Sequence, residues 1–161
     1  MLIAAVITVV IYMLVQSAKY ANERAKSPFK YFNWSEFDSP DAPGSGKLEM
    51  NEGFVHTLDQ IRSCAGFPFV ITSGYRTPAH NERVGGVANS SHIKGIAVDI
   101  AAPTESLKRK IAECAIRNGI TRIGWGSSFI HLDMDQEKSQ NVVWNYGNSA
   151  PSFNELAQNL A

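Results

Sequence analysis

The chain of 161 residues is poor in cysteine, carries no excess charge of either sign and shows no internal repeat. Fifteen Lys and Arg balance fifteen Asp and Glu, so the basic excess typical of nucleic-acid-binding proteins is missing and no nucleic-acid partner is expected. The two cysteines, Cys64 and Cys114, are too few for a disulfide framework and lack the C-x-x-C spacing of a zinc or redox pair. Both fall in predicted helices, which favours small, buried apolar residues. The length leaves room for one domain with short extensions.

Charged side chains are absent from residues 2–18, an apolar run near the N-terminus. As a helix this run would be about 25 Å long, slightly short of the ~30 Å hydrocarbon core of a bilayer. We expect a retained membrane anchor, because a signal peptide would have positive charge before the apolar run and a small-residue cleavage site. A cleaved signal and a helix buried against protein are the alternatives. Residues 1–27 are therefore predicted to form a membrane anchor with a basic juxtamembrane segment, and residues 28–161 the functional domain.

Hydrophobic periodicity predicts helices and strands without strict alternation. Apolar residues recur with helical spacing over 52–65 and 104–118, and a glycine closes each run. Short apolar runs predict strands at 67–72, 96–101, 120–125, 129–133 and 142–146. Glycine and serine at 126–128 indicate a hairpin, and a capping box at Ser152 and Glu155 predicts a final helix. We expect an α+β fold with a small, mainly antiparallel sheet flanked by helices, and an N-terminal apolar helix.

A long segment, residues 73–95, separates the first two predicted strands and is rich in Gly, Ser and Asn. We interpret it as an irregular loop. Loops of this length inside a compact domain are usually functional, so binding or catalytic residues are expected in it.

Two predicted strands and this loop place polar side chains together. Period-2 alternation sets Asp99 on one face of its strand, and His131 and Asp133 on one face of theirs, away from the core residues between them. His92 precedes the first of these strands, and Gly95 allows a sharp turn between them. If the strands are neighbours, His92, Asp99 and His131 converge as the three protein ligands of a catalytic zinc site. The alternative is an exposed loop His92 and a hydrogen-bonded His131 in the sheet.

The residues around these positions resemble a family of zinc D-alanyl-D-alanine carboxypeptidases and L-alanyl-D-glutamate peptidases. Residues 90–99 (SSHIKGIAVD) match that family's S-x-H-x-x-G-x-A-x-D motif, and residues 73–76 (SGYR) match its S-G-Y-R element. Residues 129–133 (FIHLD) resemble the strand that carries the third ligand, and the resemblance extends from about Phe32 to Tyr146.

The resemblance implies a ligand set and a substrate contact. By it, His92, Asp99 and His131 bind Zn²⁺, Arg76 binds a substrate carboxylate, and the fold is a small antiparallel sheet flanked by helices. One position departs from the pattern: many members carry Glu or Asp as general base three residues before the last histidine, where this chain has Ser128. Asp133 is our candidate for the catalytic base, and orienting a ligand imidazole is an equal alternative.

The function implied is zinc-dependent hydrolysis of an amide bond in the peptidoglycan stem peptide, of the D,D-carboxypeptidase or L,D-endopeptidase type. The alternative, favoured by Ser128, is a non-catalytic zinc-stabilised module that binds the cell wall. A wall substrate needs the domain to face the wall, whereas the basic residues after position 18 favour the cytoplasmic side. A phage lytic protein would tolerate either topology. We therefore expect a protein anchored in a bacterial inner membrane or a virion membrane, with its domain facing the wall.

Overall fold

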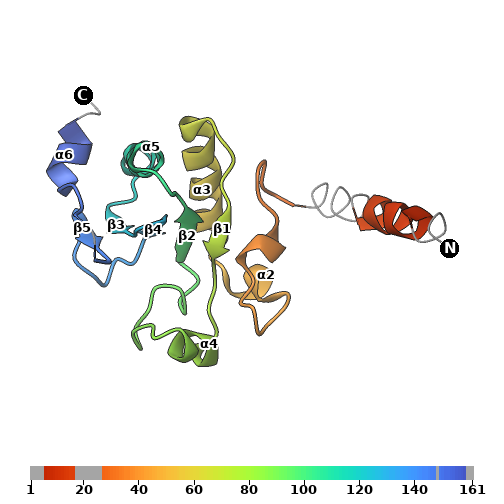
Figure 1. Ribbon diagram of the computed structural model, residues 1–161. Coiled ribbons are helices and arrows are strands. Elements are labelled where there is room, and N and C mark those ends of the chain that lie inside the picture. The colour runs from red at the N-terminus through yellow and green to blue at the C-terminus, as the bar shows by residue number, and fades with distance from the viewer. Residues whose placement is uncertain (1–5, 17–26, 148, 159–161) are drawn as a thin grey trace.

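The computed structural model describes residues 6–16, 27–147 and 149–158. Residues 6–16 are helical and their apolar side chains are exposed (Figure 1). The described residues 6–16 span about 16 Å as a helix, roughly half the thickness of a hydrocarbon core. Within the described ranges no helix has the length and apolar character needed to cross a bilayer. The predicted membrane-anchored localisation is therefore wrong; residues 2–5 and 17–26, the rest of the predicted anchor and basic segment, lie outside the described residues.

A five-stranded sheet in the order β1-β2-β4-β3-β5 forms the centre of the fold (Figure 1). Its strands are β1 (Ile71–Ser73), β2 (Ala97–Ala101), β3 (Arg122–Trp125), β4 (Phe129–Asp133) and β5 (Val142–Asn145). Three pairings, β1–β2, β2–β4 and β3–β4, are antiparallel, whereas β5 pairs in parallel with β3. The α+β class is confirmed, but the sheet is mixed, because residues 134–141 carry the chain past the start of β3 to its outer edge.

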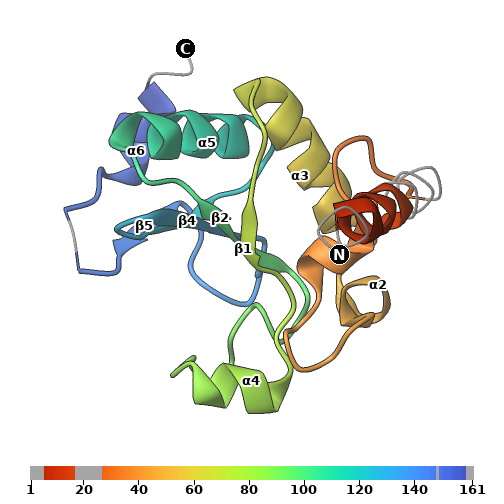
Figure 2. The ribbon, with the colours of Figure 1, turned by 45° about the vertical axis from the view of Figure 1, so that its right-hand side comes forward.

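Helices cover one face of this sheet (Figure 2). The two amphipathic helices are α3 (Glu52–Ala65) and α5 (Glu105–Arg117), which pack against each other, and α6 (Phe153–Gln158) packs on α5. Both begin at a side-chain cap, since Asn51 and Thr104 accept the backbone N–H groups of Phe54 and Leu107. The predicted capping box of the last helix is also present, because Ser152 and Glu155 bond to each other's backbone N–H.

The hydrophobic core lies between these helices and the sheet. Its completely buried members include side chains of α3, α5, β2 and β4, namely Phe54, Leu58, Ile61, Ile111, Ala115, Val98, Ile100, Ile130 and Leu132. The strand residues among them alternate with the polar candidates named above. The core therefore turns the other face of β2 and β4 away from the helices, and that face is free for chemistry.

A disulfide joins Cys64 of α3 to Cys114 of α5, with the two Cα atoms 5.7 Å apart. The prediction of two separate buried cysteines was wrong. Each cysteine has the expected place in a helix, but their proximity comes from the packing of two helices that are 50 residues apart at these positions. Residue spacing along the chain carries no such information.

The segment 73–95 is more ordered than predicted. It contains α4 (Pro78–Arg83), which lies beyond the uncovered face of the sheet (Figure 2). Thr77 caps this helix by accepting the N–H of His80, and Pro78 occupies its first position. Two further short helices, η1 (Trp34–Phe37) and α2 (Ser45–Glu49), lie on the β1 side of the molecule (Figure 1).

Candidate metal centre

Neighbouring strands bring two of the candidate ligands side by side. Asp99 of β2 is paired with His131 of β4, and Gly124 of β3 lies directly across from His131 on the other side. Both polar side chains are almost completely buried, with residue exposures of 8% and 5%. The predicted alternation is thus observed, and the two side chains share the face of the sheet that the helices leave uncovered.

The third candidate, His92, is fixed by the segment that follows β1. Its Nδ1 donates to the Gly74 carbonyl oxygen at 2.6 Å, and its own carbonyl accepts the Arg76 N–H at 3.2 Å. The turn after it requires glycine, since Gly95 has φ +66° and a Cβ there would lie 1.9 Å from the Glu49 carbonyl oxygen. Residue exposure of His92 is 3%.

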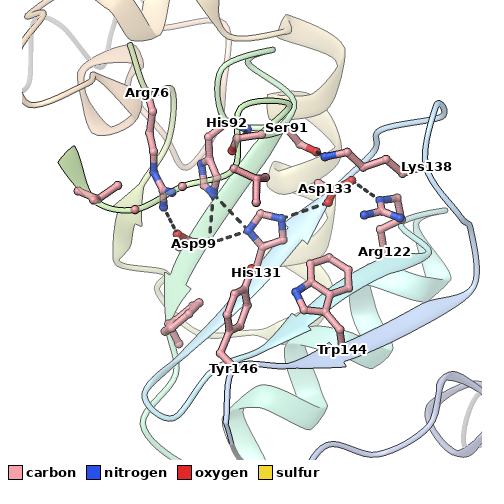
Figure 3. A pocket seen from close by; sticks show the side chains of 16 residues that line it. Arg76, Ser91, His92, Asp99, Arg122, His131, Asp133, Lys138, Trp144 and Tyr146 are labelled. Atoms are coloured by element: carbon pink, nitrogen blue, oxygen red, sulfur yellow. Dashed lines mark hydrogen bonds and ion pairs between the residues drawn. The ribbon is translucent and has the colours of Figure 1, made fainter. Parts of the chain in front are cut away.

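Three donor atoms of these residues face one another (Figure 3). His92 Nε2 lies 3.2 Å from His131 Nδ1, which lies 2.7 Å from Asp99 Oδ1, and His92 Nε2 is 3.4 Å from the same oxygen. Four tetrahedral ligands at zinc's usual bond lengths stand about 3.3 Å from one another. The three ligand atoms all lie within 4.8 Å of one another.

Hydrogen bonds on the far side of each ring decide which nitrogens can bind a metal. His92 donates from Nδ1 to Gly74, and His131 donates from Nε2 to Asp133 at 3.1 Å. In the neutral imidazoles, the facing His92 Nε2 and His131 Nδ1 therefore carry lone pairs. Two lone pairs and a carboxylate that point at one another repel unless a cation lies between them. The donor set and its spacing fit zinc.

Burial and charge act in opposite directions on these groups. Burial alone would raise the pKa of Asp99, but His131 and His92, which donate to Asp99 when their rings are protonated, outweigh it and hold the pKa well below the ordinary value. Burial lowers the pKa of His92. Burial also acts to lower the pKa of His131, yet the carboxylates of Asp133 and Asp99 raise it overall. An ionised Asp99 and a neutral His92 are the forms that ligate a metal.

Asp133, the candidate base, lies behind His131 and not in front of the ligand atoms. One of its oxygens accepts from His131 Nε2; the other accepts from Arg122 Nε at 2.7 Å and from the Asp135 N–H at 3.0 Å. Burial would raise the pKa of Asp133, but these bonds lower it overall. Arg122 is itself held by the Ser139 carbonyl oxygen.

Arg76 joins the group from the segment after β1. Its Nη2 lies 2.6 Å from Asp99 Oδ2, and its Nε donates to Ser73 Oγ at 2.7 Å. The S-G-Y-R element thus places its arginine against the outer oxygen of the candidate ligand Asp99. The guanidinium is fixed on that side and lines the same cavity as the three ligands.

The cavity over these residues has a volume of about 570 Å³. Its polar floor is formed by the residues above, and an aromatic wall is formed by Phe129, Trp144 and Tyr146 (Figure 3). The predictions from the sequence did not include Trp144 and Tyr146. The missed signal was the alternation along the predicted strand 142–146, which sets positions 144 and 146 on one face.

A second polar network ties the His92 loop to the connection after β4. The buried carboxylate of Asp135 accepts from Ser91 Oγ at 3.1 Å and from Lys94 Nζ at 3.0 Å. Lys138 Nζ donates to Ser91 Oγ at 3.0 Å and to the Asn89 carbonyl oxygen at 2.8 Å. The network holds the loop from the side opposite Gly74, so His92 is fixed from both directions.

Comparison with known proteins adds a family match. A family model described as Peptidase M15 matches residues 35–133, which is more than half of the chain and includes Arg76 and the three candidate ligands. The chain also resembles the crystal structure of Serratia marcescens L-Ala D-Glu endopeptidase ChiX, with 20% identity and a TM-score of 0.45. That likeness covers 56% of this chain and 84% of the other. A comparison with curated proteins finds no match.

Proposed function

We propose that this chain, which belongs to the Peptidase M15 family, hydrolyses an amide bond in the stem peptide of peptidoglycan. M15 peptidases are zinc-dependent metallopeptidases, and His92, Asp99 and His131 are the residues that we propose as ligands. The observation that carries the proposal is the set of three buried donor atoms that face one another at the floor of a cavity. Residues 28–161 are the proposed peptidase domain. A role in phage lysis stays a prediction.

The residues around the ligands support a fixed, pre-formed site. When bound, zinc supplies a water of lowered pKa and a positive charge that polarises the scissile carbonyl. The Gly74 carbonyl and the Asp133 carboxylate hold the two imidazoles with their lone pairs turned inward. No rearrangement of the rings is then needed on metal binding, which favours a catalytic over a merely adventitious site.

Arg76 is our candidate for substrate binding. Its guanidinium lines the cavity and is held in place by Ser73 and Asp99. A planar guanidinium in a fixed position suits a carboxylate of the substrate, and stem peptides carry carboxylates beside their amide bonds. The same contact with Asp99 gives Arg76 a second task, the orientation of a ligand carboxylate.

Mass spectrometry of muropeptides tests the proposal. The full chain, loaded with zinc and incubated with purified peptidoglycan, should release fragments whose masses identify the cleaved bond. His92→Ala should release none and bind less than one zinc, because two remaining ligands hold the ion poorly. His56→Ala is the matched control, since His56 is exposed on α3, beside Glu52 and the Phe29 ring, and does not line the cavity. A zinc-loaded wild type that binds peptidoglycan and cleaves nothing would support the wall-binding module instead.

A further inference from the structure

Tyr146 lies over a hollow that a glycine leaves in the sheet. Gly124 of β3 is in register with His131 of β4 on one side and with Trp144 of β5 on the other. A Cβ at Gly124 would lie 2.7 Å from Tyr146 Cε2 and 2.9 Å from His131 Cβ. The tyrosine ring therefore occupies space that a side chain at position 124 would fill, immediately beside a proposed metal ligand.

Neighbouring rings hold Tyr146 in this place. Its ring centroid lies 5.4 Å from that of Phe129 and 6.3 Å from that of Trp144, and Trp144 in turn lies 5.4 Å from His131. The backbone is fixed as well, because the Tyr146 N–H donates to the Trp125 carbonyl oxygen at 3.0 Å. Figure 3 shows Tyr146 and Trp144 on the same side of the cavity as His131.

The other titratable side chains of the cavity are already engaged with one another. Asp133 is bound to His131 and Arg122, and Lys138 is bound to Ser91 and the Asn89 carbonyl. Tyr146, by contrast, is half exposed and lines the cavity, so its hydroxyl proton is available to a molecule that binds there. The nearby indole N–H of Trp144 is a donor only, so it does not take up that proton.

The protonation state of Tyr146 suits a donor. Burial raises the pKa of Tyr146, and the Trp144 indole opposes this only in part. The phenol is therefore neutral at physiological pH and holds a proton that it can share. A neutral phenol cannot replace the general base that the family carries where this chain has Ser128, but it can stabilise negative charge.

We propose that Tyr146 is a further catalytic residue, whose hydroxyl donates a hydrogen bond to the carbonyl oxygen of the scissile amide as negative charge develops on that oxygen. The inference rests on the proposed peptidase function. The Tyr146 hydroxyl would stabilise the transition state and not the bound substrate, because the charge on the carbonyl oxygen arises only as water attacks. No bond to Tyr146 forms or breaks, and its proton stays on the phenol.

Tyr146→Phe tests the inference, since it keeps the ring between Phe129, Trp144 and Gly124 and removes only the hydroxyl. With a muropeptide substrate of wild type, kcat should fall about 10²-fold, the usual effect of losing one oxyanion donor, while KM and zinc content stay near wild type. Tyr31→Phe is the matched control, because Tyr31 lies beside Lys30 and Arg62 and does not line the cavity.

A second readout does not depend on turnover. A phosphinate analogue of the cleaved peptide carries a charged oxygen where the carbonyl oxygen would be, so its Kd should rise in Tyr146→Phe by a factor similar to the loss of kcat. The Kd of the product peptide should not change. Unchanged kcat and unchanged phosphinate affinity would overturn the inference about Tyr146 but not the proposed peptidase function. A loss of bound zinc large enough to explain the loss of activity would do the same. A wild type that cleaves no muropeptide would overturn both.

Discussion

The neighbours of Asp133 determine what this carboxylate can do. A general base needs a lone pair that faces the attacking water, whereas both oxygens of Asp133 are turned toward His131, Arg122 and the Asp135 N–H. Its lowered pKa also makes it a weak proton acceptor. Of the two roles that the sequence leaves open, we therefore propose the second: Asp133 orients His131 and keeps its Nδ1 turned to the metal.

Asp133→Asn separates these two roles. If Asp133 orients His131, zinc affinity should fall about 10–100-fold and activity should return at saturating zinc. Zinc titration alongside the peptidase rate measures both quantities. Glu113→Gln, a loss of one charge on α5, serves as the control. A fall of kcat by ~10²–10⁴ with full zinc occupancy would instead make Asp133 the general base.

At the scale of elements, β3 is important because Gly124 has no side chain. Gly124 leaves room for His131 Cβ and for the rings of Tyr146 and Trp144, all of which would lie 2.7–3.0 Å from a Cβ at that position. An aromatic wall can therefore lean across β3 toward β4. The cavity owes its shape to one strand that has no side chain at this point.

Gly124→Ala should damage both packing and activity. The added methyl group would lie 2.9 Å from His131 Cβ and 2.7–3.0 Å from the rings of Tyr146 and Trp144, so these groups must shift and the free energy of unfolding should fall by about 1–3 kcal/mol. Activity should fall further than stability alone explains, because Tyr146 and His131 are displaced. Urea unfolding and peptidase rates measure the two effects. Gly53→Ala on the exposed side of α3 is the control. Equal losses of stability and activity in the two variants would contradict the role of the space beside Gly124.

The elements that could be predicted are those whose sequence signals lie within the element itself. α3, α5 and the β3–β4 hairpin have local signals: periodicity, caps and a glycine-serine turn. α4 was missed although Thr77 and Pro78 are a good helix start, because the glycine-rich composition around them dominated. The parallel position of β5 depends on a crossing of β3 that nothing at residues 134–141 specifies.

The candidate site was predictable to the same degree. Alternation along single strands put Asp99 and His131 on one face, the position of His92 just before the first strand brought it to them, and the motif resemblance added Arg76. Trp144 and Tyr146 could not be placed beside them, since that needs the register of three strands. The role of Asp133 needs the position of Arg122, which comes from a neighbouring strand.

At the scale of the whole molecule, the disulfide ties the helical layer together. Cys64–Cys114 closes a loop with a sequence separation of 50, for which loop-closure entropy gives a stabilisation of roughly 4 kcal/mol. Reduction should lower the Tm by about 8–16 °C. Activity of the folded enzyme should be retained, because the bond lies on the side of the sheet away from the cavity. Thermal unfolding with and without dithiothreitol measures this. A Cys64→Ser/Cys114→Ser variant should have the low Tm and no response to the reductant; a Tm unaffected by reduction would contradict the prediction.

The covering of only one face of the sheet determines how a large substrate can approach. The helices back the sheet on one side, and the proposed ligands lie on the other side, beneath a cavity bounded by loops and by the edge strand β5. A cross-linked polymer is too extended to enter an enclosed chamber, and its interior bonds have no nearby free end. The proposed ligands, at the floor of an open cavity, can instead be approached by the polymer from the side, so the proposed peptidase would reach a bond within the network without threading a chain end through the protein.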